Sequence, residues 1–227
     1  MTYAFKQNLL PTSKYTLKAP YSMTAHFITV HNTANDASAA NEVKYMNSNN
    51  NQVSYHVAVD DKEIILAIPF NRNAWHCGDG QGKGNRQSIG IEICYSKSGG
   101  ARYITAEENA VQYIAKLLKE FGWGIDRVKQ HYDWSKKDCP HRIRAEGRWN
   151  SFLKRIEEAM KPSTQSQQKE ETKVPNTLTS TAKEDLKVLL KVAKSKGILK
   201  VDHSEKVGSM TDGEALGLLI SVVKRTL

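Results

Sequence analysis

The sequence lacks any long run of apolar residues. No apolar stretch approaches the roughly 20 residues that a membrane-spanning helix requires, so we expect no insertion into a bilayer. The amino-terminal segment has one short apolar pair and no small-residue cleavage signal, so we predict no secretory signal peptide. We therefore expect the chain to be made and folded in the cytoplasm.

Cysteine is scarce as well. The three cysteines, Cys77, Cys94 and Cys139, are an odd number, which argues against a disulfide framework and leaves one thiol available as a ligand. The net charge of +9 favours a polyanionic partner, such as nucleic acid, an anionic membrane or a cell wall, although a solvated basic surface explains it equally. Scattered lysines and the absence of a recognised binding motif argue against nucleic acid.

Periodicity in the first part of the chain predicts an α/β fold with a mixed central β-sheet flanked by helices. The segments FITVH, VSYHVAVD, EIILAIP and SIGIEICYS are short and β-branched, as strands are. Residues 36–49 fit a helix that buries Ala39, Val43 and Met46. A helix over 105–122 is predicted to begin at the capping box of Thr105 and Glu108, and another spans 144–160.

The composition predicts two unequal domains. Residues 161–177 contain almost no large apolar side chain, so we interpret them as a linker between a first domain, 1–160, and a small module, 178–227. The module contains two amphipathic segments, each opening with Thr-x-x-Glu, and is predicted to be mostly helical. Because so short a module buries little surface, we expect a second copy, another domain or a ligand to help stabilise it.

The segment HYDWSKKDCPH, residues 131–141, has the highest density of chemically reactive side chains. His131 and Cys139 suit a zinc ion, and His31, at the end of the strand FITVH, could supply a third ligand and leave a position for water. Two alternatives stay open: an ordinary loop with a buried free cysteine, which this segment alone favours, or a Cys139 nucleophile with His131 as its base.

Glu92 interrupts the otherwise apolar strand SIGIEICYS, and burying an unpaired carboxylate is costly. It could act as a general base beside a metal-bound water, or form a structural ion pair with an arginine such as Arg86. For His56, a buried structural role is favoured over ligation, whereas His76 lies in a Gly-rich loop that could form a substrate wall.

Residues 24 to 160 resemble the zinc-dependent N-acetylmuramoyl-L-alanine amidases of phage-lysozyme and peptidoglycan-recognition-protein type, especially the endolysins of Bacillus phages. The resemblance rests on ITVHNT, NNNQVSYHVAVDD, NAWHCGDGQGKGNRQSIGIEICYSKSGG and HYDWSKKDCPHRIRAEGRW, in that order. It implies a peptidoglycan hydrolase that uses zinc-activated water, with one Zn2+ per catalytic domain. The bond cut would be the amide between the lactyl group of N-acetylmuramic acid and L-alanine of the stem peptide.

The resemblance also implies roles for individual residues. The zinc ligands would be His31, His131 and Cys139. Glu92 would be the general base and Lys137, rather than Lys136, would stabilise the oxyanion, with Tyr55 as an auxiliary candidate. By position alone, Trp75, Asn85 and Arg86 are candidate substrate contacts.

The tail is similar to the wall-binding domains of the same endolysins. We therefore expect peptidoglycan and an anionic polymer of the Gram-positive cell wall as partners, reached from the host cytoplasm after release. Two other functions stay open, namely a non-catalytic peptidoglycan-binding protein and a cysteine peptidase of the stem peptide. Non-catalytic relatives commonly lack the cysteine ligand, so the presence of Cys139 favours an enzyme.

Overall fold

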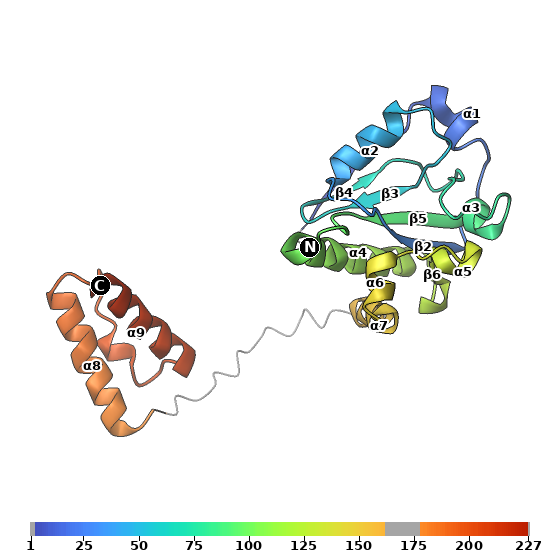
Figure 1. The fold of residues 1–227 in the computed structure, drawn as a ribbon. Coiled ribbons are helices and arrows are strands. Elements are labelled where there is room, and N and C mark those ends of the chain that lie inside the picture. Colours follow the sequence, from blue (N-terminus) through green and yellow to red (C-terminus); the bar gives the residue numbers. More distant parts are fainter. Residues whose placement is uncertain (1–2, 162–177, 227) are drawn as a thin grey trace. The chain divides into compact units, whose positions relative to one another are not determined.

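The structure, a computed structural model, describes residues 3–161 and 178–226. The chain divides into two compact units, Met1–Pro162 and Ser163–Leu227, which are described separately (Figure 1). Apart from Lys161, the predicted linker lies outside the described residues. Among the helices that are described, none has both the length and the apolar character needed to cross a membrane.

The first unit is built on a six-stranded sheet with the order β1-β4-β3-β5-β2-β6. Neighbouring strands β3 and β4 are antiparallel, and the remaining neighbours are parallel. The predicted mixed sheet flanked by helices is therefore confirmed. The strands are β1 (Ala4–Gln7), β2 (Phe27–Asn32), β3 (Val57–Val59), β4 (Glu63–Leu66), β5 (Ser88–Ile93) and β6 (Val128–Gln130).

Helices cover both faces of this sheet (Figure 1). Helix α2 lies on one face and buries Ala39, Val43 and Met46, as its periodicity predicts. Helices α4 and α7 lie on the other face and pack against each other. The helical elements are η1 (Thr12–Lys14), α1 (Tyr15–Lys18), α2 (Ala39–Ser48), α3 (Lys83–Gln87), α4 (Gly100–Phe121), η2 (Ile125–Arg127), α5 (His131–Ser135), α6 (His141–Ala145) and α7 (Trp149–Met160).

The prediction that α4 begins at the Thr105 capping box is wrong. The helix begins at Gly100, and the hydroxyl of Thr105, already inside it, donates to the carbonyl of Ala101 at 3.0 Å. Tertiary packing overrides the local cap signal, because Tyr103 in the added turn is buried at 2% exposure. The other end matches the prediction, since Gly122 adopts the left-handed conformation that ends the helix.

The helix predicted over 144–160 is two helices, α6 and α7, separated at Gly147, which has a positive φ of 65°. Within α7, Phe152 and Ile156 are fully buried. The buried carboxylate of Glu107 on α4 accepts from Arg148 at 2.6 Å and from Arg155 at 2.5 Å, which ties α7 to α4. Paired in this way, the carboxylate is compatible with its burial.

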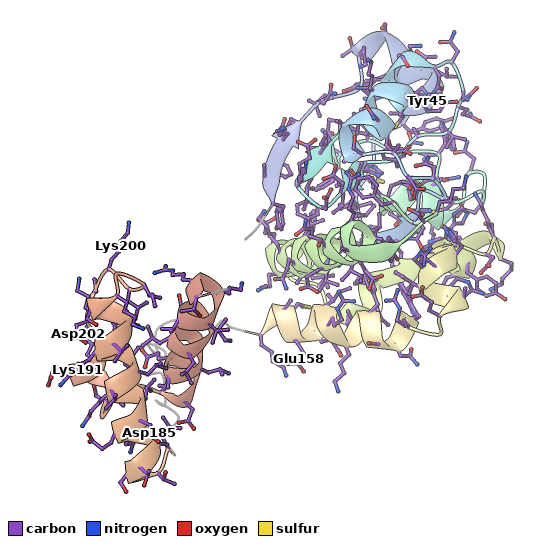
Figure 2. The ribbon with its side chains drawn as sticks, turned by 60° about the vertical axis from the view of Figure 1, so that its left-hand side comes forward. Tyr45, Glu158, Asp185, Lys191, Lys200 and Asp202 are labelled. Carbon is purple, nitrogen blue, oxygen red and sulfur yellow. The ribbon has the colours of Figure 1, made fainter. Side chains whose placement is uncertain are left out.

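The second unit contains α8 (Ser180–Ser195), η3 (Ser204–Lys206) and α9 (Asp212–Thr226). Thr179 caps α8 by accepting from the amide of Ala182, so the cap predicted at Thr181 is not used. The second predicted capping box forms, because the Thr211 hydroxyl accepts from the amide of Glu214 at 3.2 Å. Charged side chains such as Lys191, Lys200 and Asp202 are exposed on this unit (Figure 2).

Candidate metal centre and active site

His31, His131 and Cys139 converge at one end of the sheet. His31 is near the end of β2, His131 opens α5 and Cys139 lies between α5 and α6. The Nδ1 atoms of the two histidines are 3.1 Å apart, and Cys139 Sγ is 3.7 Å from His31 Nδ1. All three ligand atoms lie within 4.8 Å of one another and all three residues are buried. This donor set and spacing could hold a metal ion.

His131 is not in an irregular loop, as the sequence suggested. Gln130 and Asp133 form a capping box that starts α5 at His131, and Lys136 ends the helix in the left-handed conformation. The first residue of the helix is thereby fixed next to the end of β2, because β6 pairs with β2 immediately before it. The chain then returns to bring Cys139 back to the same place, where its carbonyl accepts from the amide of Tyr132 at 3.0 Å.

Burial sets the protonation of these groups. It lowers the pKa of His131 to about 4 and that of His31 well below its ordinary value, with nearby His76 adding to the effect at His31. Both imidazoles are therefore neutral at pH 7, which is the form that binds metals. Burial, together with Glu92, raises the pKa of the Cys139 thiol to about 12, so the thiolate requires a nearby cation.

His76 orients His31 from the side away from the proposed ligands. His31 Nε2 lies 2.9 Å from His76 Nδ1, and His76 Nε2 lies 3.2 Å from the carbonyl oxygen of Ser88. Because a carbonyl oxygen only accepts, the Nε2 atom of His76 must carry a hydrogen, and its Nδ1 atom is then free to accept one from His31 Nε2. With its hydrogen on Nε2, His31 keeps the lone pair of Nδ1 for a metal. The sequence interpretation of His76 as a substrate wall missed this role.

One signal in the sequence could have revealed it. A Cβ atom at position 90 would lie 2.8 Å from the ring of His76, so only glycine fits under that ring. Gly90 interrupts an otherwise apolar strand, and an isolated strand glycine often marks such a close approach. The buried structural role expected for His56 is confirmed, since its ring bonds the carbonyl of Arg72 and the amide of Gly90, each at 2.9 Å.

Glu92 is adjacent to this group. It is the Cα partner of His31 across the β2–β5 ladder, and its Oε2 atom is buried without a hydrogen-bond partner among the described residues. Burial, with Glu42 nearby, raises the pKa of Glu92 to about 8. The alternative of an ion pair with Arg86 is not found, because Arg86 bonds Gln81 and lies 3.9 Å over the ring of Tyr21.

Two hollows flank the group and share Val53 and Lys137 in their walls. The first, about 340 Å³, is also lined by Tyr55, Glu92 and Cys139. Tyr45, an exposed residue of α2 that is labelled in Figure 2, also lines this hollow. The second, about 520 Å³, is lined by residues that include Trp75, His76 and His131. A substrate lying across both hollows would contact the metal-binding group and Glu92 together.

The remaining predicted site residues occupy different surroundings. Tyr55 precedes β3, and its buried hydroxyl has no partner among the described residues. Lys137 is exposed and lines both hollows, whereas Lys136 lies 5.1 Å over the ring of Tyr132. Asn85 lines the second hollow, but its amide accepts from the backbone of His76 and Cys77 and donates to Gly80. Arg86 is not among the residues that line either hollow.

The first part of the chain is similar to proteins of one known family. Residues 21–142 match the family model described as N-acetylmuramoyl-L-alanine amidase. The chain is 61% identical over 156 residues to the N-acetylmuramoyl-L-alanine amidase CwlA of Bacillus subtilis, covering 68% of this chain and 57% of that protein. With the amidase XlyB of the same organism it is 58% identical over 161 residues, covering 70% of this chain and 51% of that protein.

The solution structure of the PlyG catalytic domain is 54% identical and superposes with a TM-score of 0.67, covering 71% of this chain and 98% of that one. The chain spans about half the length of the curated relatives it matches. The family match covers the strands and loops that carry His31, Glu92, His131 and Cys139. The chain therefore belongs to the N-acetylmuramoyl-L-alanine amidase family.

Proposed function

We propose that the chain is a zinc-dependent peptidoglycan hydrolase that cleaves the amide between the lactyl group of N-acetylmuramic acid and L-alanine of the stem peptide. One observation carries the proposal. A buried His, His and Cys set lies beside a buried carboxylate oxygen that has no partner among the described residues. This is the combination that metal-assisted hydrolysis needs, namely ligands and an adjacent proton acceptor.

The donor set fits zinc better than the hard cations. Two neutral imidazoles and one sulfur are borderline ligands, whereas Mg2+ and Ca2+ prefer oxygen. Three protein ligands also leave a fourth tetrahedral position open. A zinc ion held by His31, His131 and Cys139 would supply the Lewis acidity that lets water attack at neutral pH.

The chain's own side chains would handle the proton and the developing charge. Glu92, next to His31 in the ladder, would accept the proton of the attacking water and pass it to the departing amine. The ammonium of Lys137, in the wall shared by the hollows, would stabilise the negative charge on the carbonyl oxygen. The hydroxyl of Tyr55, in the same hollow as Glu92, is an auxiliary donor.

Digestion of purified Bacillus cell wall tests this function. We expect new L-alanine amino termini without new reducing sugar ends, loss of both product and activity in chelator, and recovery on adding Zn2+. New reducing ends would instead indicate glycan cleavage, and stoichiometric binding without any product would indicate a recognition protein.

A cysteine peptidase is the other enzymatic candidate, and the raised pKa of the Cys139 thiol disfavours it. An imidazole nitrogen is in reach, since His31 Nδ1 lies 3.7 Å from Cys139 Sγ, but burial raises the pKa of the thiol to about 12 and so leaves little thiolate at pH 7. A cysteine nucleophile needs a lowered pKa and an adjacent base. Activity that survives chelator but is lost on thiol alkylation would support the peptidase and contradict the amidase.

We propose that residues 178–227 form a cell-wall-binding module and that the protein acts on the wall after release from the cytoplasm of the host. The exposed charges of α8, lysines among them, suit an anionic wall polymer. Co-sedimentation with Bacillus walls tests this role. The full chain should co-sediment, and a chain ending at residue 160 should bind at least about tenfold more weakly, as expected when two binding modules are reduced to one.

A further inference from the structure

Lys18, at the end of α1, is a fully buried lysine that precedes the family-matched region. Its ammonium donates to three oxygens, which are Asn49 Oδ1 at 3.1 Å, the carbonyl of Asn51 at 2.5 Å and the carbonyl of Val53 at 3.1 Å. Three acceptors need three N–H donors, which only the charged form of lysine has. One buried ammonium therefore holds Asn49, Asn51 and Val53 together, while Lys14 donates to the carbonyl of Asn49 and to Asn50 Oδ1 in the same loop.

The position of this cation has a physical cause. Asn49 is the C-cap of α2, where the last helical carbonyls lack intrahelical partners and the helix dipole is negative. The chain then curls around Lys18, and the amide of Asn51 donates to Asn49 Oδ1 at 2.8 Å. The next paired strand, β3, begins only at Val57, so side-chain bonds from lysine, chiefly from the buried Lys18, hold the loop in place of a sheet ladder.

The same loop borders the candidate active site. Asn49, Asn51 and Val53 line the first hollow, and Gln52 and Val53 line the second. Val53 is 66% exposed and lines both hollows, so a shift of the loop would change the wall of each.

Lys18 is also linked to Trp75 through Ser54. The hydroxyl of Ser54 donates to the carbonyl of Lys18 at 2.6 Å and accepts from the amide of Trp75 at 2.9 Å. The amide of Ser54 donates to the carbonyl of Trp75 at 3.1 Å. Because Trp75 lines the second hollow, Ser54 links Lys18 to a further residue of that wall.

We propose that Lys18 is a positioning residue for the substrate, whose ammonium fixes the loop of residues 49–53 as the wall against which a peptidoglycan fragment binds. The inference rests on the proposed function. Lys18 contacts neither the metal-binding residues nor Glu92, which are supplied by β2, β5 and the segment after β6. Losing it should therefore weaken substrate binding and leave the chemical step nearly intact.

Steady-state kinetics of the zinc-loaded full chain on soluble peptidoglycan fragments test this. Lys18→Met keeps the length of the side chain and removes all its donors. We expect KM to rise about tenfold, kcat to change less than about threefold and the bound zinc to stay unchanged. Lys14→Met is the matched comparison, because Lys14 is a half-buried lysine that also donates to this segment, at the carbonyls of Ser48 and Asn49 and at Asn50 Oδ1, whereas the bonds to Asn51 and Val53 come from Lys18. Its KM should change less than about twofold.

A second measurement needs no substrate. Amide hydrogen exchange around residues 50–54 should become faster in Lys18→Met, while exchange in β2 and β5 stays as in the wild type. If Lys18→Met fails to fold, Lys18→Gln, which retains N–H donors, replaces it. We then expect smaller changes in KM and in amide exchange, in the same direction. An inactive wild type would refute the proposed function but leave the exchange result standing. An active wild type whose Lys18 variants keep their KM and exchange pattern would overturn the role of Lys18.

Discussion

His31 and Glu92 are Cα partners on adjacent parallel strands, β2 and β5. Paired residues on neighbouring strands direct their side chains to the same face of a sheet, so the imidazole and the carboxylate emerge side by side. On its other side Glu92 pairs with Ala58 of β3, whose methyl group takes little space. One ladder thus fixes a proposed metal ligand and the proposed base relative to each other.

The raised pKa of Glu92 predicts how the stability of the metal-free chain depends on pH. Burial raises this pKa from 4.5 to about 8, so between these values the folded state holds a proton that the unfolded state has released. Stability should therefore fall as the pH rises through this window, and Glu92→Gln should remove that loss. The free energy of unfolding of the variant minus that of the wild type should therefore be on the order of 3 kcal/mol larger at about pH 8 than at about pH 5.

Urea denaturation in chelator, at about pH 5 and about pH 8, measures this difference. Comparing the variant with the wild type at each pH cancels the contributions of the histidines, which both proteins share. A stability difference that does not change with pH would contradict the raised pKa.

Glu92→Gln should also separate catalysis from metal binding. The amide cannot accept the proton of the attacking water, so we expect kcat to fall at least about 100-fold. Zinc content and binding to cell walls should match the wild type, because the three proposed ligands are unchanged. Full activity in a zinc-loaded variant would rule out Glu92 as the base.

The two adjacent lysines provide a matched comparison. Lys137 lines both hollows, whereas Lys136 lies over Tyr132. If Lys137 stabilises the oxyanion, Lys137→Met should lower kcat by about 100-fold to 1,000-fold. Lys136→Met removes the same charge one residue away and should change kcat less than about twofold. Equal losses in the two variants would show that only the general positive charge matters.

His76 should contribute to metal affinity without being a ligand of the proposed site. His76→Leu removes the acceptor for His31 Nε2 and should weaken zinc binding by about 10-fold to 100-fold in a chelator competition. His76→Asn places an amide oxygen near the former Nδ1 position and should restore most of the affinity. His56→Leu, in an equally buried histidine that bonds only backbone groups, serves as the control.

That control also separates two explanations. Loss of zinc binding in His56→Leu as well would indicate general damage to the sheet. If His76→Asn binds as weakly as His76→Leu, the cation is instead held by His31, His76 and Cys77, which form the second group of suitable ligands within 4.8 Å.

The sequence alone was enough to predict the α/β class, the buried face of α2 and the candidate residues for chemistry. These inferences depend on spacing within a single segment, because residues three or four apart share a helix face and alternate residues share a strand face. The residue types of a zinc site are visible in the same way, since imidazole and thiol are its usual ligands. The fixed end of α4 at Gly122 is likewise local, because glycine tolerates the left-handed conformation.

Only the tertiary structure decided which of these residues meet. His31 and His131 are 100 residues apart and come together because β2 lies between β5 and β6. Helix α4 begins at Gly100 rather than at Thr105 because Tyr103 is buried by distant neighbours. The roles inferred for His76, which orients His31, and for Lys18, which holds the loop of residues 49–53, likewise depend on partners in other segments. Strand order and long-range hydrogen bonds leave no periodic trace in a sequence, so the sequence indicates the candidate ligands but only the fold brings them together.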